Sequence, residues 1–208
     1  MTTPSIEDLR TTWSVRPGFA NDNANRAAIS LLADGKPATS TALAAATGIS
    51  IEQAMTYIGT ASRTGVEVED GTIVGAALTL RPTPHRMRVR GNDLYTWCGF
   101  DALFLPIMLG ERAEVGSTCP VSGTQIRLTV EADGTVSDAS PAGVGVGIVG
   151  QEVISCCAVS GPESVICTQM PLFASREAGE RWLADHPGVA IVDLDDAREI
   201  ARVYVEAF

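Results

Sequence analysis

The spacing of apolar residues predicts helices near the N-terminus of the chain. Between residues 23 and 33, alanine and leucine recur at helical spacing, and the same is true of a shorter segment over 40–47. Ser50 and Gln53 form a capping box, in which each side chain can bond the free backbone amide of the other, so a third helix is expected to begin there. Residues 1–22 are expected to form a leader that contains a short helix after Ser5.

A β-hairpin is predicted after these helices. The apolar runs over 66–68 and 72–80 flank Asp70-Gly71, which is a typical hairpin turn. Three helices and a hairpin over 23–80 are typical of a winged-helix module. Because the third helix carries Glu52 and little positive charge, we expect the module to be structural or a docking face; contact with DNA is the alternative.

The remaining residues, 81–208, predict a mixed, β-rich core with flanking helices, and hence an α+β protein. A helix is expected over 93–109, and further helices after Ser175 and over 195–207. Short runs bounded by Gly, Pro and Asp predict strands. These runs are 113–116, 126–131, 144–149, 153–157, 164–173 and 188–192.

The charge of the chain argues against nucleic-acid binding. The formal net charge is −10, and a strongly acidic surface repels phosphate. The first eight residues have neither the basic nor the apolar part of a signal peptide. No apolar run is long enough to cross a bilayer. We therefore expect a cytoplasmic protein with no membrane partner. Arg86, Arg88 and Arg90 alternate along a predicted strand, which is interpreted as a solvated face; a weak anion site is the alternative.

Candidate chemistry rests on the thiols and one carboxylate. Cys98 lies three residues before Asp101, and on a helix these positions would share a face. Cys98 alone could be a small buried hydrophobe. Asp101 is more informative, because an unpartnered carboxyl in an apolar segment is costly to bury and its pKa tends to rise, which suits proton delivery.

The other cysteines lie in the C-terminal half. Cys167 follows an apolar run, and Cys156 and Cys157 are adjacent in sequence. Cys119 begins a turn in which Ser122 replaces the second cysteine of a zinc knuckle, so no zinc site is expected. Five cysteines in a reducing compartment favour free thiols or metal ligands over a disulfide framework.

The segment Leu94-Tyr95-Thr96-Trp97-Cys98-Gly99-Phe100-Asp101-Ala102-Leu103-Phe104-Leu105-Pro106 resembles the signature of the organomercurial (alkylmercury) lyases of bacterial mercury resistance. Other segments occur in the order found in that family, so the resemblance covers about residues 24–200. These segments are the winged-helix-like N-terminus, Gly75–Arg81, Cys119–Gly123, Pro141–Gly143 and Leu172–Ser175.

The resemblance implies that two thiolates and one acid cleave a carbon–mercury bond by protonolysis. Cys98 and Asp101 match the first cysteine and the aspartate, Cys167 matches the second cysteine, and Cys119 matches a structural one. The family commonly has Cys and His directly after the second cysteine, whereas this chain has Thr168-Gln169, so Cys157 remains an alternative second thiol. Both thiols would hold the product Hg(II), because soft thiolates suit mercury.

The implied reaction needs no organic cofactor. Trp97 and Phe100 could form an apolar wall for the organic group, or be plain core aromatics. The Hg(II) product would pass to a mercuric reductase or to cellular thiols. Two alternatives are a thiol-dependent lyase or hydrolase on a non-mercury substrate, and a metal-responsive winged-helix regulator. Asp101 argues against the regulator, because a metal sensor needs thiols but no proton donor.

Overall fold

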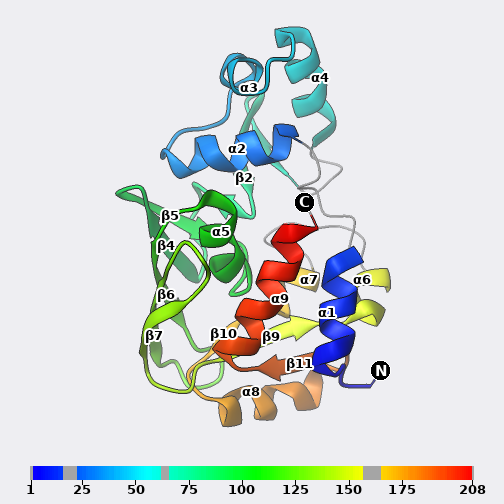
Figure 1. The fold of residues 1–208 in the computed structure, drawn as a ribbon, viewed down its shortest axis with the longest axis vertical. Helices are drawn as coiled ribbons and strands as arrows, with labels where there is room; N and C mark the ends of the chain where they lie inside the picture. The colour runs from blue at the N-terminus through cyan, green and yellow to red at the C-terminus, as the bar shows by residue number, and fades with distance from the viewer. Residues whose placement is uncertain (1, 16–22, 62–65, 157–164, 208) are drawn as a thin grey trace.

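The computed structural model describes residues 2–15, 23–61, 66–156 and 165–207 (Figure 1). A large and a small antiparallel sheet are surrounded by helices, so the predicted α+β class is confirmed. None of the described helices is both long and apolar enough to span a bilayer. The helices are α1 (Ile6–Val15), α2 (Asn23–Ala33), α3 (Ser40–Thr47), α4 (Ile51–Ala61), α5 (Asp101–Leu109), α6 (Gln151–Cys156), α7 (Val165–Thr168), α8 (Arg176–Trp182) and α9 (Leu194–Glu206).

Helices α2 and α3 begin and end where the apolar spacing predicts, and α4 begins where the capping box predicts. The capping box before α4 is present: the backbone N–H of Ser50 donates to Gln53 Oε1 at 2.9 Å, and the N–H of Gln53 donates to Ser50 Oγ at 3.1 Å. The predicted hairpin follows as β1 (Glu67–Glu69) and β2 (Thr72–Ala76). Three helices and a hairpin therefore occur in the expected order, and the winged-helix comparison itself stays a prediction.

The large sheet has the strand order β1-β2-β3-β5-β4-β6-β7-β8. Its short strand β3 (Leu78–Thr79) pairs with β5, which joins the N-terminal hairpin to the rest of the sheet. The predicted boundaries at residues 22 and 80 stay predictions. The other strands are β4 (His85–Val89), β5 (Asn92–Thr96), β6 (Ala113–Thr118), β7 (Gln125–Val130) and β8 (Val136–Ser140).

Helix α2 is tied to the turn between β4 and β5. The Arg90 guanidinium donates to the carbonyl of Ser30 and to Asp34, both at 3.0 Å, and Asn92 Nδ2 donates to the carbonyl of Ala33 at 3.0 Å. Helix α2 thus packs on the sheet that carries the rest of the fold.

The helix predicted over 93–109 is wrong in its first half, where the chain forms strand β5. Arg90 and Gly91 both have positive φ, at 52° and 78°, so they form the tight two-residue turn that matches the twist of a hairpin. Burial then alternates, with Leu94 and Thr96 facing the core. The aromatic residues at positions 95 and 97 obscure this period of two in the sequence. Because the chain forms a strand up to Thr96, residues 97–100 form a loop and α5 begins only at Asp101.

The small sheet has the order β10-β9-β11, formed by β10 (Leu172–Phe173), β9 (Gly145–Val149) and β11 (Val189–Val192). Helices α1 and α9 lie side by side over it (Figure 1), and the Trp13 indole N–H of α1 donates to the Val149 carbonyl at 3.2 Å. The strands predicted over 153–157 and 164–173 are wrong except for β10, because α6 and α7 occupy their described parts. Short apolar runs do not distinguish a buried strand from a buried helix by periodicity alone.

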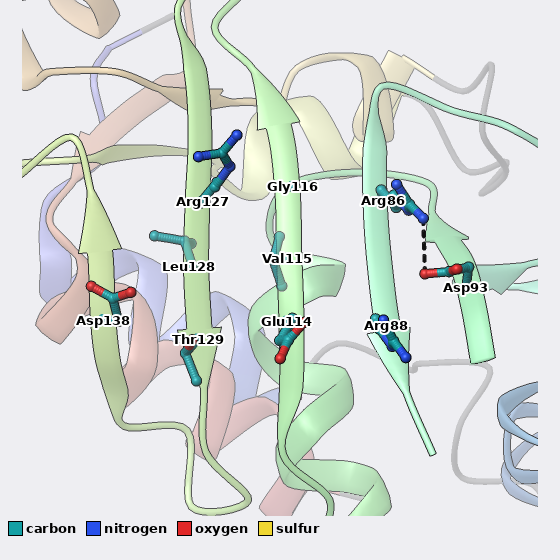
Figure 2. Close-up of a pocket in the computed structure, with 10 residues that line it drawn as sticks. All are labelled: Arg86, Arg88, Asp93, Glu114, Val115, Gly116, Arg127, Leu128, Thr129 and Asp138. Atoms are coloured by element: carbon teal, nitrogen blue, oxygen red, sulfur yellow. Dashed lines mark ion pairs between the residues drawn. The ribbon is translucent and has the colours of Figure 1, made fainter. Parts of the chain in front are cut away.

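The outer face of the large sheet carries balanced charge. A hollow of about 450 Å³ lies there. Gly116 lies in register between Arg86 and Arg127 on the neighbouring strands (Figure 2). Three arginines line it, but so do three acidic residues, and Arg86 pairs with Asp93 at 3.0 Å. This balance favours the solvated-face interpretation over an anion site.

Candidate active site

Cys98 and Asp101 hold each other at the start of α5. The backbone N–H of Cys98 donates to Asp101 Oδ2 at 3.1 Å, and the backbone N–H of Asp101 donates to Cys98 Sγ at 3.4 Å. The predicted shared helical face is therefore replaced by reciprocal bonds across the first turn, similar to those of a capping box. Behind them, the Thr96 hydroxyl donates to the carbonyl of Cys98 at 2.8 Å, which fixes the loop to β5.

A second segment brings Cys167 to the same place. Cys167 lies on α7, and its carbonyl accepts from the N–H of Met170 at 3.2 Å. The carbonyl of Met170 in turn accepts from the N–H of Gly99 at 2.8 Å. A Cβ at Gly99 would lie 2.9 Å from the backbone nitrogen of Leu172, so only glycine allows the two segments to approach this closely.

The result is a buried cluster of two thiols and one carboxylate. Cys98 Sγ, Cys167 Sγ and a carboxylate oxygen of Asp101 all lie within 4.8 Å of one another. Cys98 is fully buried, and Cys167 and Asp101 are each 6% exposed. Thiol sulfurs at this separation could share one soft metal ion, and the carboxylate lies close enough to exchange a proton with them.

The environment favours the neutral thiol at Cys98. Burial is the main cause that raises the pKa of Cys98 well above its ordinary value, and the hydrogen bond with Cys167 and the negative charge of Asp101 raise it further. The backbone N–H of Asp101 acts in the opposite direction, because it donates to the sulfur. Cys98 therefore carries its proton at neutral pH until a ligand displaces it.

The two predicted wall residues are both buried. The ring centroid of Phe100 lies 4.7 Å from that of Trp13 and 5.8 Å from that of Phe104, so Phe100 belongs to a core aromatic cluster. Trp97 is 4% exposed, and its indole N–H donates to Glu67 Oε2 at 3.2 Å. Contact of either ring with an organic group stays a prediction.

The remaining cysteines lie outside this cluster or outside the described residues. Cys119 is buried in the turn after β6, where its N–H donates to the Thr124 carbonyl at 2.9 Å. Burial raises the pKa of Cys119, but hydrogen bonds with Ala174 and Ser122 outweigh burial and leave the pKa below its ordinary value. Cys157, the alternative second thiol, is outside the described residues, and the side chain of Cys156 is not described either.

Two residues with close contacts at the loop that carries Cys98 were not identified from the sequence. Gly99 interrupts an apolar segment, and an isolated glycine can indicate a close backbone approach, so this signal was available. Glu67 gave no signal, because its hydrogen bond to Trp97 joins residues 30 positions apart.

Comparison with known proteins identifies the fold and the family. The family model described as alkylmercury lyase matches residues 78–206. The chain belongs to the alkylmercury lyase family. It is 37% identical over 182 residues to the alkylmercury lyase of Streptomyces lividans, covering 88% of this chain and 81% of the relative. It is also 34% identical over 177 residues to that of Staphylococcus epidermidis, covering 85% and 79%.

A solved structure supports the fold over nearly the whole chain. The mercury-bound form of MerB2 superposes with a TM-score of 0.74 and covers 97% of this chain and 98% of its own. At 21% sequence identity, this likeness shows a common fold. The resemblance noted around Cys98 is thus confirmed at the level of the family.

Proposed function

We propose that this protein is an alkylmercury lyase that cleaves the carbon–mercury bond of organomercurials by protonolysis. Cys98 and Cys167 bind the mercury, and Asp101 transfers the proton. The observation that carries the proposal is the convergence of these three side chains within 4.8 Å in one buried cluster, in a chain of this family. Cys167 is preferred over Cys157 because its sulfur lies in the cluster.

The chemistry follows from the ligands. One thiolate on R–Hg⁺ gives a stable linear complex, and a second thiolate adds electron density that weakens the mercury–carbon bond. Asp101 accepts the proton that mercury displaces from Cys98 and returns it to the leaving carbon. The balance is one R–Hg⁺ and two thiols giving one hydrocarbon, one dithiolate-bound Hg(II) and one released proton.

The surroundings of the three side chains fit these roles of the two thiols and the acid. A buried site excludes water, so the proton that reaches the carbon comes from a held acid and not from bulk solvent. Trp97 and Phe100 supply apolar surface for the organic group. No organic cofactor takes part, and the Hg(II) product leaves to a mercuric reductase or to cellular thiols in the cytoplasm.

In this proposal, the N-terminal module, with its winged-helix-like layout, has a structural role and does not bind DNA. Helix α4 has Glu52 in its first turn and no basic residue in its last turn. A carboxylate within the thiol cluster likewise favours an enzyme over a metal-responsive regulator, which needs no acid.

The test separates binding from turnover. Asp101→Asn removes the exchangeable acid and keeps the size of the side chain, so the variant should protect its thiols from alkylation when phenylmercury is added. It should release benzene at least about 10²-fold more slowly than the wild type, as measured by headspace gas chromatography. Cys98→Ala should lose both thiol protection and turnover.

Near-normal benzene release by Asp101→Asn would remove the carboxylate from the mechanism. Wild-type protein that is folded and reduced, but inactive on phenylmercury and methylmercury, would overturn the proposed function.

A further inference from the structure

The carboxylate of Glu67 lies beside the loop that carries Cys98, although it belongs to strand β1 of the N-terminal hairpin. Glu67 Oε2 accepts the indole N–H of Trp97 at 3.2 Å and the hydroxyl of Thr79 at 2.7 Å. Trp97 directly precedes Cys98 in the chain. One oxygen of this half-buried residue therefore accepts hydrogen bonds from the residue next to Cys98 and from strand β3, which pairs with β5.

The structure makes room for this carboxylate. A Cβ at Gly75, on the neighbouring strand, would lie 1.9 Å from Glu67 Oε2, so any larger residue at position 75 would displace it. The backbone of Trp97 is held as well, since its N–H donates to the Ala77 carbonyl at 3.0 Å. Trp97 is thus fixed through both its main chain and its ring.

We propose that Glu67 is a positioning residue for Cys98, acting through the indole of Trp97. The inference rests on the proposed function for its activity readout. A buried indole N–H that loses its acceptor is costly to leave unpaired, so the ring would turn to another partner and the loop would shift with it. The sulfur of Cys98 would then lie farther from that of Cys167, although both thiols remain in the chain.

The experiment compares Glu67→Leu with Glu67→Gln. Leucine removes the acceptor at similar bulk, whereas glutamine keeps an oxygen that can accept from both Trp97 and Thr79. We expect Glu67→Leu to lower kcat for benzene release from phenylmercury about 10-fold with little change in KM, because a small misplacement of reacting groups slows the chemical step. Glu67→Gln should restore most of this loss.

Glu69→Leu is the matched control. Glu69 lies on the same strand, but its carboxylate pairs with Arg81 at the surface, at 3.2 Å, so its loss should leave kcat unchanged. Gly75→Ala provides an independent route, because the added methyl displaces the Glu67 carboxylate and should reproduce the kcat loss of Glu67→Leu without altering Glu67.

A second readout does not depend on turnover. Hg(II) alone is titrated into each variant in competition with dithiothreitol, and the mercury–thiolate absorption in the ultraviolet reports the dithiolate complex. Glu67→Leu should bind Hg(II) about 10-fold more weakly, and Glu67→Gln and Glu69→Leu should match the wild type. Thermal unfolding of each variant identifies any that fail to fold, in which case Gly75→Ala decides.

Wild-type kcat and Hg(II) affinity in Glu67→Leu or, where that variant does not fold, in Gly75→Ala would overturn the inference. Equal losses in Glu67→Leu and Glu69→Leu would also overturn it, since they would point to a general effect on β1. If the wild type releases no hydrocarbon, the proposed function fails, and the Hg(II) titration alone decides the role of Glu67.

Discussion

Replacing Gly99 with alanine should separate the two segments that bring Cys98 and Cys167 together. The added methyl would lie 2.8 Å from Leu172 Cγ and 2.9 Å from the Leu172 backbone nitrogen. Favourable contacts of carbon begin near 3.5 Å, so the loop and β10 must move apart by about 0.6–0.7 Å. Leu172 is fully buried on a paired strand, and its backbone has little freedom to yield.

The magnitude follows from this displacement. A misplacement of about 1 Å can lower a rate by about 10²-fold, so about 0.6–0.7 Å should lower kcat roughly 20-fold. Overpacking should also cost about 1–3 kcal/mol in the free energy of unfolding, measured with urea. Gly116→Ala is the control, because its Cβ would meet only Arg86 Cβ, at an ordinary 3.9 Å.

Hydrocarbon release and Hg(II) affinity are measured on Gly99→Ala, on Gly116→Ala and on the double variant Gly99→Ala, Leu172→Ala. The double variant removes the side-chain clash but keeps the backbone clash, so only part of the activity should return. Wild-type kcat and stability in Gly99→Ala would refute the reasoning, because the close approach would then not determine where the two sulfurs lie.

Two further predictions concern pH and thiol reactivity. Burial lowers the pKa of His85 to about 4, so the folded protein excludes a proton that the unfolded chain binds below pH 6.5. The free energy of unfolding should therefore be highest above pH 6.5 and fall by about 3 kcal/mol as the pH drops toward 4. Urea unfolding of His85→Gln should show a smaller loss over the same pH range. Because Cys98 is fully buried and its pKa is raised, iodoacetamide should modify it far more slowly near neutral pH than in the unfolded chain, and mass spectrometry of the Cys98 peptide checks this. Rapid modification of the folded protein would contradict a buried, protonated thiol.

Local patterns in the sequence account for the helices that begin at a capping signal, whereas strand β5 depends on long-range contacts. The capping signals at Ser50 and Ser175 are decided within four residues, so α4 and α8 begin as predicted. Strand β5 is decided instead by pairing with β4 and β3 on either side, which the sequence does not show. The segment 94–97 is apolar enough to suit either form, and its partners determine which one it takes.

The candidate site shows the same division. Cys98 and Asp101 are three residues apart, and this spacing brings them together both on a helix and across the turn that leads into α5. The pair was therefore identified correctly although the local structure was predicted wrongly. The meeting with Cys167 depends on Gly99 bonding Met170, across about 70 residues of chain, and only the family resemblance indicated it.

The raised pKa of Cys98 is consistent with the roles proposed for the two thiols and the acid. A thiol with a low pKa would bind mercury readily but would already have lost its proton before the substrate arrived, so it could not supply that proton to the carbon. At Cys98 the free protein keeps the proton on sulfur, and only a ligand as soft as mercury displaces it. Asp101, whose carboxylate already accepts the backbone N–H of Cys98, lies where the displaced proton must go. In the proposed mechanism, metal binding itself thus loads the acid that later protonates the carbon.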